Sequence, residues 1–104
     1  MLNEKDYCDL KTVKELESLG MNIYTSFNGV NVVRNILLYE AQKWLREEKG
    51  IIVGIINNFT IQAFDYYVST WEEDRCRGNK YSSYEDALQR GIKEAIKILK
   101  EPTV

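Results

Sequence analysis

The sequence predicts an α+β domain: a short N-terminal helix, then two hairpin–helix (ββα) units, whose four strands form an antiparallel four-stranded sheet with helices packed mainly on one face. Two observations lead to this prediction. Residues 82–99 have the periodicity of a helix with a broad apolar face, and residues 21–35 and 51–72 contain apolar or alternating segments separated by turn residues. At 104 residues the chain has the length of one domain, so residues 1–104 are taken as a single unit.

The first element, residues 10–19, is expected to be a short helix. Asp9 and Thr12 are both residue types that cap helix N-termini, and Gly20 follows at the C-terminal end, where glycine is common. The apolar stripe along this segment is only moderate, so the pattern leaves open whether this helix packs on the sheet.

A β-hairpin is expected next, because an Asn-Gly pair at residues 28–29 lies between two alternating segments. A two-residue turn at this pair places Phe27 opposite Val30. One face of the hairpin then carries Ile23, Thr25, Phe27, Val30 and Val32. We expect this face to contribute to the common sheet.

The second helix is expected over residues 36–49. Asn35 can cap its start and Gly50 can close its end, and the apolar positions between them have helical spacing. These positions are Leu37, Leu38, Ala41, Trp44 and Leu45.

Two further strands are expected after this helix. Residues 51–57 are apolar at both sets of alternating positions, which is typical of a strand covered on both faces. A partner strand is expected over residues 64–72, where aromatic residues alternate with others. If the helices cover only one face of the sheet, something else must cover the other, and a second copy of the chain is the candidate we favour.

The third helix, within residues 82–99, has the clearest signals. Ser82 and Glu85 have the spacing of a capping box, Lys97 and Lys100 suit the C-terminal end of the helix dipole, and Pro102 prevents continuation. Its apolar half consists of Tyr84, Ala87, Leu88, Gly91, Ile92, Ala95, Ile96, Ile98 and Leu99. A face this wide requires a broad partner such as a sheet.

The residue composition excludes most familiar catalytic designs. The chain has no histidine, which removes serine–histidine and cysteine–histidine nucleophiles and histidine-ligated metals. The two cysteines, Cys8 and Cys76, are too few for a cysteine zinc site and are expected to be free thiols. Flanking arginines could activate Cys76, but an unremarkable loop cysteine is the preferred interpretation. We therefore expect no enzyme activity, catalytic residue, cofactor or metal.

Charge and hydropathy limit the partners and the location. A net charge of −2 argues against general binding of polyanions. No apolar run reaches the length of a membrane span, and the first residues lack the pattern of a signal peptide. The expectation is a cytoplasmic protein without membrane contact.

Two groups of residues are candidate binding elements. Tyr67 and Trp71 are four apart on the expected last strand, so they would project from one face as hot-spot or stacking residues, although packing as a second core layer is the preferred alternative. Arg75, Arg77 and Lys80 surround Gly78-Asn79 in what is interpreted as a flexible basic loop that could hold a phosphate or carboxylate. A solvated hairpin loop is the preferred interpretation of that group.

Two stretches of the chain carry a resemblance. Residues 39–51, YEAQKWLREEKGI, and 81–99, YSSYEDALQRGIKEAIKIL, with the apolar and aromatic strand between them, resemble small uncharacterised proteins of gut anaerobic bacteria and their phages. The resemblance implies a phage or mobile-element setting. It implies no activity and no functional residue.

The function predicted from these observations is that of a non-enzymatic protein-interaction module, acting as a homodimer or as an adaptor on another protein. Its contact surface would be the free sheet face with Tyr67 and Trp71. The alternative is a nucleic-acid-binding accessory protein, in which these aromatics stack on bases and Arg75, Arg77 and Lys80 contact phosphates. The overall acidity disfavours this alternative.

Overall fold

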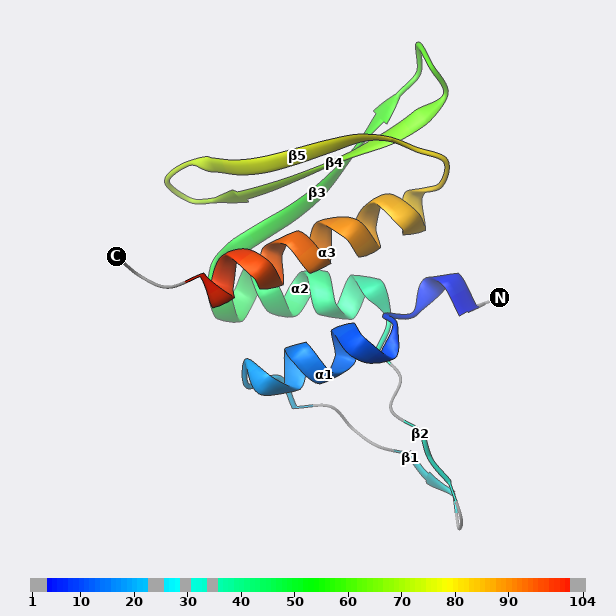
Figure 1. The fold of residues 1–104 in the computed structure, drawn as a ribbon, viewed down its shortest axis with the longest axis vertical. Helices are drawn as coiled ribbons and strands as arrows, with labels where there is room; N and C mark the ends of the chain where they lie inside the picture. Colours follow the sequence, from blue (N-terminus) through cyan, green and yellow to red (C-terminus); the bar gives the residue numbers. More distant parts are fainter. Residues whose placement is uncertain (1–3, 23–25, 29–30, 34–35, 102–104) are drawn as a thin grey trace.

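Three α-helices and a three-stranded antiparallel sheet dominate the computed structural model, which describes residues 4–22, 26–28, 31–33 and 36–101 (Figure 1). The elements are, in chain order, a 3-10 turn Glu4–Asp6, α1 Leu10–Ser18, β1 Ser26–Asn28, β2 Asn31–Val33, α2 Leu38–Lys49, β3 Ile51–Asn58, β4 Ala63–Thr70, β5 Asp74–Tyr81 and α3 Tyr84–Lys100. The strand order of the main sheet is β3-β4-β5, a simple meander.

The predicted four-stranded sheet built from two ββα units is wrong, although the fold is of the α+β kind. β1 and β2 form a separate two-stranded ribbon, and the main sheet consists of three consecutive strands between α2 and α3. Each strand of the ribbon has only three residues, and Figure 1 shows the ribbon at the opposite end of the molecule from the main sheet. The ribbon therefore adds no strand to the large sheet.

The register of the ribbon also differs from the prediction. Phe27 pairs with Val32 instead of Val30, and Asn28 pairs with Asn31. The predicted face residues Ile23, Thr25 and Val30 lie outside the described residues.

The third strand of the sheet, β5, replaces the predicted basic loop. Its sequence, DRCRGNKY, lacks the apolar alternation on which the strand prediction depended. It is held as a strand by pairing with β4, where Val68 lies opposite Cys76 and Tyr66 opposite Gly78. Two irregularities in the register, between Phe64 and Tyr66 and between Val68 and Ser69, interrupt this pairing.

The broad apolar face of α3 packs on one face of the sheet, as predicted. The helix approaches closely at Gly91, where a Cβ atom would lie 2.5 Å from Val53 Cγ1 and 3.4 Å from Tyr66 Cβ. The buried residues of this layer include Ile51, Val53, Tyr66 and Val68 on the strands and Ala87, Leu88, Ile92, Ala95 and Ile96 on the helix. Tyr84 is only half-buried, and its ring packs edge-on against that of Phe64.

The other two helices complete the layers. α2 lies beside α3 and contacts β3, and α1 packs on the side of these helices that faces away from the sheet (Figure 1). The first helix therefore docks on helices, through the buried residues Thr12, Val13 and Leu16. No described element lies across the second face of the sheet, which we call the outer face (Figure 1).

The helix caps agree with the prediction in part. Asp9 caps α1 by accepting a hydrogen bond from Thr12 N at 2.8 Å, and Gly50 ends α2 in the left-handed conformation with φ +64°. The cap of α3 is Ser83 rather than Ser82, because its hydroxyl accepts from Asp86 N. Leu37 takes the capping position of α2; the proposed cap Asn35, like Pro102, lies outside the described residues.

Candidate functional site

The outer face of the β3–β4 hairpin is an apolar surface that no described element covers. Strand residues alternate between faces, and those opposite the buried set point outward. The outward positions pair across the strands as Ile52 with Ser69, Gly54 with Tyr67, and Ile56 with Asp65. The sequence led us to expect cover on both sides of residues 51–57, and within the described part of the chain only the inner side has it: Ile51 and Val53 are buried, while Ile56 is 44% exposed.

Tyr67 lies flat across the outer face because its neighbour on β3 has no side chain. A Cβ atom built on Gly54 would overlap the Tyr67 ring. Glycine at this position therefore lets the aromatic ring cover the backbone of β3. On the other side, Tyr67 pairs with Arg77 of β5, so one predicted aromatic residue and one predicted basic residue are neighbours on this face.

The tip of the hairpin extends the apolar surface. Phe59 is 83% exposed and Ile61 is 48% exposed, and the tip projects past the helices (Figure 1). A hollow of about 250 Å³ beside Phe59 is lined by Asn57, Asn58, Phe59, Gln62, Ala63 and Phe64. We call the set Ile52, Ile56, Phe59, Ile61 and Tyr67 the hairpin surface.

Trp71 lies at some distance from this set. β4 ends at Thr70, so Trp71 belongs to the turn into β5 and does not continue the alternation with Tyr67. Its side chain is 79% exposed and lies near Gly50, at the junction of α2 and β3. The structure therefore brings Tyr67 to the centre of the outer face and Trp71 to its far end.

The predicted basic residues Arg75 and Arg77 have acidic partners within the chain. Arg75 Nη1 lies 3.3 Å from Glu73 Oε1, and its Nη2 lies 3.2 Å from Glu101 Oε2 at the end of α3. Arg77 Nη2 lies 3.3 Å from Asp74 Oδ2. These pairs neutralise much of the positive charge that a phosphate would need, which weighs against the nucleic-acid alternative.

Lys80, the third basic residue, is near the end of β5 with a positive φ of 69°. Its backbone N–H donates to Asp65 Oδ1 at 3.1 Å, across the strand pair. The group Arg75, Arg77 and Lys80 is thus spread along one strand, and no common loop gathers it around a single anion.

The two cysteines do not have the properties of nucleophiles. Burial, reinforced by the nearby carboxylates of Asp9 and Glu40, raises the pKa of the Cys8 thiol to about 12. Burial and then the charge of Glu94 raise the pKa of Cys76, and these effects outweigh the opposite effect of Arg75. The arginines beside Cys76 therefore do not activate it.

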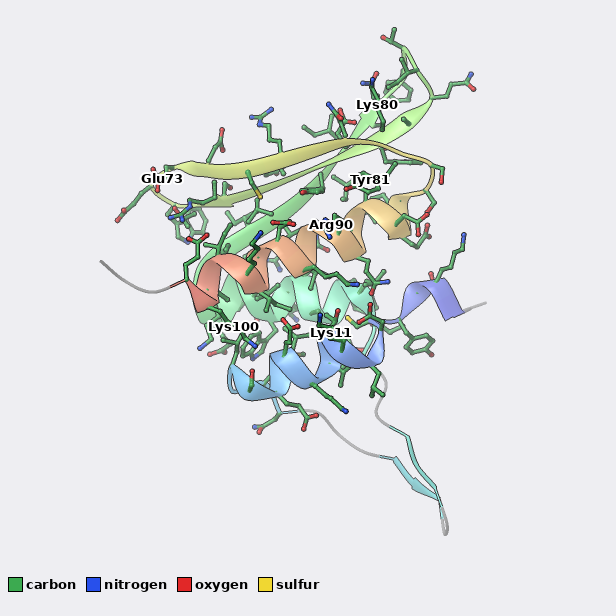
Figure 2. All side chains as sticks on the ribbon, viewed as in Figure 1. Lys11, Glu73, Lys80, Tyr81, Arg90 and Lys100 are labelled. Atoms are coloured by element: carbon green, nitrogen blue, oxygen red, sulfur yellow. The ribbon has the colours of Figure 1, made fainter. Side chains whose placement is uncertain are left out.

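A larger hollow, of about 630 Å³, runs between α1 and α3. Figure 2 labels Lys11, Arg90 and Lys100 along it, and its full lining is Lys11, Thr12, Glu15, Arg90, Lys93, Glu94, Lys97, Lys100 and Glu101. Charged pairs join the two helices across it: Lys93 Nζ lies 2.6 Å from Asp9 Oδ2, and Lys100 Nζ lies 3.9 Å from Glu15 Oε2. We interpret this charged seam as the attachment of α1 to α3.

The described residues contain no cluster of three or more metal-ligating side chains. Within the same ranges, no helix is both long and apolar enough to cross a membrane.

Sequence reasoning missed most of the hairpin surface, because it concentrated on aromatic and basic residues of the later strand. A signal was nevertheless present. Residues 50–64 contain no Asp, Glu, Lys or Arg in a chain in which 29% of residues are charged. A charge-free stretch of this length that ends in an exposed turn indicates a surface kept clear of solvating groups.

No family model matches the sequence, and no curated protein and no solved structure was found to be similar to it. The resemblance to proteins of gut anaerobes and their phages therefore stays a prediction.

Proposed function

We propose that this chain is a non-enzymatic protein-interaction module, a homodimer or adaptor, that contacts its partner through the hairpin surface. The observation that carries the proposal is the contrast between the two faces of one sheet. The inner face is buried under α3, whereas the outer face continues into a tip whose Phe59 is 83% exposed. Exposed apolar groups arranged together in this way are typical of binding surfaces.

The composition of the hairpin surface suits a protein partner. Aromatic side chains in the centre of an apolar patch supply most of the affinity in many protein interfaces. Tyr67 and Phe59 can serve in this way, and Arg77 and Asp65 lie at the rim next to them. A phage or mobile-element setting belongs to the same proposal.

The proposal is tested with the purified full chain immobilised as bait in a lysate of its own host, together with light scattering of the chain alone. The variant Phe59→Ser removes the exposed aromatic ring at the tip. Tyr39→Ser is the matched control, because Tyr39 is 60% exposed but lies on α2, away from the hairpin. We expect a bound protein to be lost with Phe59→Ser and kept with Tyr39→Ser. A chain that is monomeric and retains no protein would contradict the proposal.

A further inference from the structure

The two edge strands of the main sheet differ sharply in charge. In the order β3-β4-β5, the first and last strands each have one side without a neighbouring strand among the described residues. β5 carries Asp74, Arg75, Arg77 and Lys80, and its pairing with β4 is irregular. Charges and bulges of this kind are the usual protection of an edge strand against unwanted pairing. β3 has eight residues, none of them charged, in unbroken register with β4.

Among the residues that the structure describes, cover is found on only half of the β3 edge. At the half next to α2, Ile51 and Val53 are buried, and the Gln42 side-chain amide donates to the Val53 carbonyl at 2.6 Å. From Ile55 to Asn58 the strand continues toward the tip with partly or fully exposed side chains. This open part is short, but it is in regular register with β4 and has no charged residue, proline or bulge, which are the features that protect an edge strand from pairing.

We propose that the open half of β3 pairs antiparallel with β3 of a second copy of this chain. This inference goes beyond the proposed function, because it adds a contact along the strand edge that is separate from the hairpin surface. The occupant is a second copy because a twofold pairing sets the segment 50–64 against itself, and this segment has no charge that could repel its counterpart. The product is a continuous sheet in the order β5-β4-β3-β3-β4-β5 that joins the two outer faces. Ile56 and Tyr67 of both copies then form one larger apolar surface.

The symmetry of such a pair gives a direct test. When two identical antiparallel edges form one sheet, the twofold axis is perpendicular to the sheet, and one residue lies opposite its own copy. Directly opposed residues in antiparallel strands have Cα atoms about 4.5–5.5 Å apart, which is within the range of a disulfide. A single cysteine at that residue therefore links the two copies, whereas a cysteine one position away points to the opposite face.

The experiment is a cysteine scan in the full-length chain with Cys76→Ser as background; Cys8 is buried and stays. Cysteine replaces residues 55, 56, 57 and 58 one at a time, and mild oxidation is followed by non-reducing electrophoresis and light scattering. Asn79→Cys, an exposed position on β5, is the control. We expect a dimer in light scattering and at least tenfold more cross-linked dimer at one of the four positions than at Asn79→Cys.

A substitution on the outer face tests whether the dimer depends on the strand edge or on the outer face. Tyr67→Ala shortens the side chain at the centre of the outer face and leaves the β3 backbone in place, so we expect both the dimer and the cross-link to remain. Loss of the dimer in Tyr67→Ala would overturn edge pairing. So would an amount of cross-linked dimer that is no higher at any of residues 55–58 than at Asn79→Cys. A monomer that still captures another protein through Phe59 overturns this inference alone. A monomer that captures nothing overturns the proposed function as well.

Discussion

The charged seam between α1 and α3 and the hairpin surface are both accessible to solvent, but they are built in opposite ways. In the seam, charged groups find partners on the facing helix, such as Asp9 with Lys93 at 2.6 Å. In the hairpin surface, apolar groups face outward, and within the described part of the chain no element covers them. The comparison shows that hollows and uncovered apolar residues need not coincide. The larger hollow lies where the chain satisfies its own charges, whereas the uncovered apolar residues lie on the hairpin.

The most disruptive test removes the layer that supports both regions. Gly91→Leu puts a side chain where α3 meets Val53, so the helix must move off the sheet. We expect the free energy of unfolding to fall by about 3 kcal/mol or more, as for severe overpacking. Urea denaturation measures it. Lys97→Leu, which adds the same side chain at an exposed position of the same helix, should change stability by no more than about 0.5 kcal/mol.

A smaller effect is expected on the outer face itself. Gly54→Ala adds a methyl group beneath the Tyr67 ring, which must then lift from the sheet. A loss of about 1–2 kcal/mol is expected, in the range of moderate overpacking. The double variant Gly54→Ala with Tyr67→Ala should recover much of this loss, and if it does not, the ring is not the cause.

In the seam, Asp9→Ala removes both the cap of α1 and the partner of Lys93. The loss of a helix cap costs about 1 kcal/mol, and the half-exposed ion pair adds little. Thermal unfolding should show this decrease, while Glu47→Ala, on the exposed side of α2, should leave the transition unchanged. Equal effects of the two variants would mean that the seam does not hold α1.

Acid should weaken the seam without affecting the hairpin surface. Burial raises the pKa of Asp9, but hydrogen bonds from Lys93 and Thr12 outweigh it, so the pKa falls from 3.8 to about 2. A carboxyl group with a lowered pKa in the folded state contributes stability above its unfolded pKa, and this contribution disappears as the pH falls toward the folded value. Stability should therefore decrease between about pH 4 and pH 2, and the slope should be shallower in Asp9→Ala. Parallel slopes would exclude Asp9 as the titrating group.

The smallest effect on stability is expected at the tip. Phe59→Ser replaces a side chain that is 83% exposed, so unfolding should change by no more than about 0.5 kcal/mol. The same variant should lose the bound partner, so it separates an effect on binding from an effect on the free energy of unfolding. If Phe59→Ser is destabilised by several times that amount, the ring belongs to the fold rather than to an interface.

The helices were predictable because each has a local signal of its own. The third helix combines an apolar half with acidic residues at its start and lysines at its end. All its buried residues belong to the apolar half that the periodicity indicated, whereas Tyr84, Ile98 and Leu99 of that half are not buried. The ends of α1 and α2 were marked by Asp9 and Gly50. Signals of this kind depend on neighbouring residues only, so tertiary contacts had little to change.

The sheet could not be predicted to the same degree, because its strands depend on contacts distant in sequence. β5 is polar along its length and becomes a strand only through its pairing with β4, where the absence of a side chain at Gly78 admits the Tyr66 ring. The apolar segment around Phe27, with stronger local signals, forms an isolated ribbon. Of the candidate site, Tyr67 was found from its alternation. Phe59 and Ile61 were missed because turn residues are not expected to be apolar.

The difference in charge between the two sheet edges also limits how many copies the proposed pairing can join. Once two copies have joined along β3, the outer edge on either side is β5, with its four charged residues and broken register. Addition of a third copy has no suitable template there, so the assembly closes instead of elongating into a fibre. Because each copy has one uncharged sheet edge and one charged edge, the proposed assembly stays a dimer at high concentration.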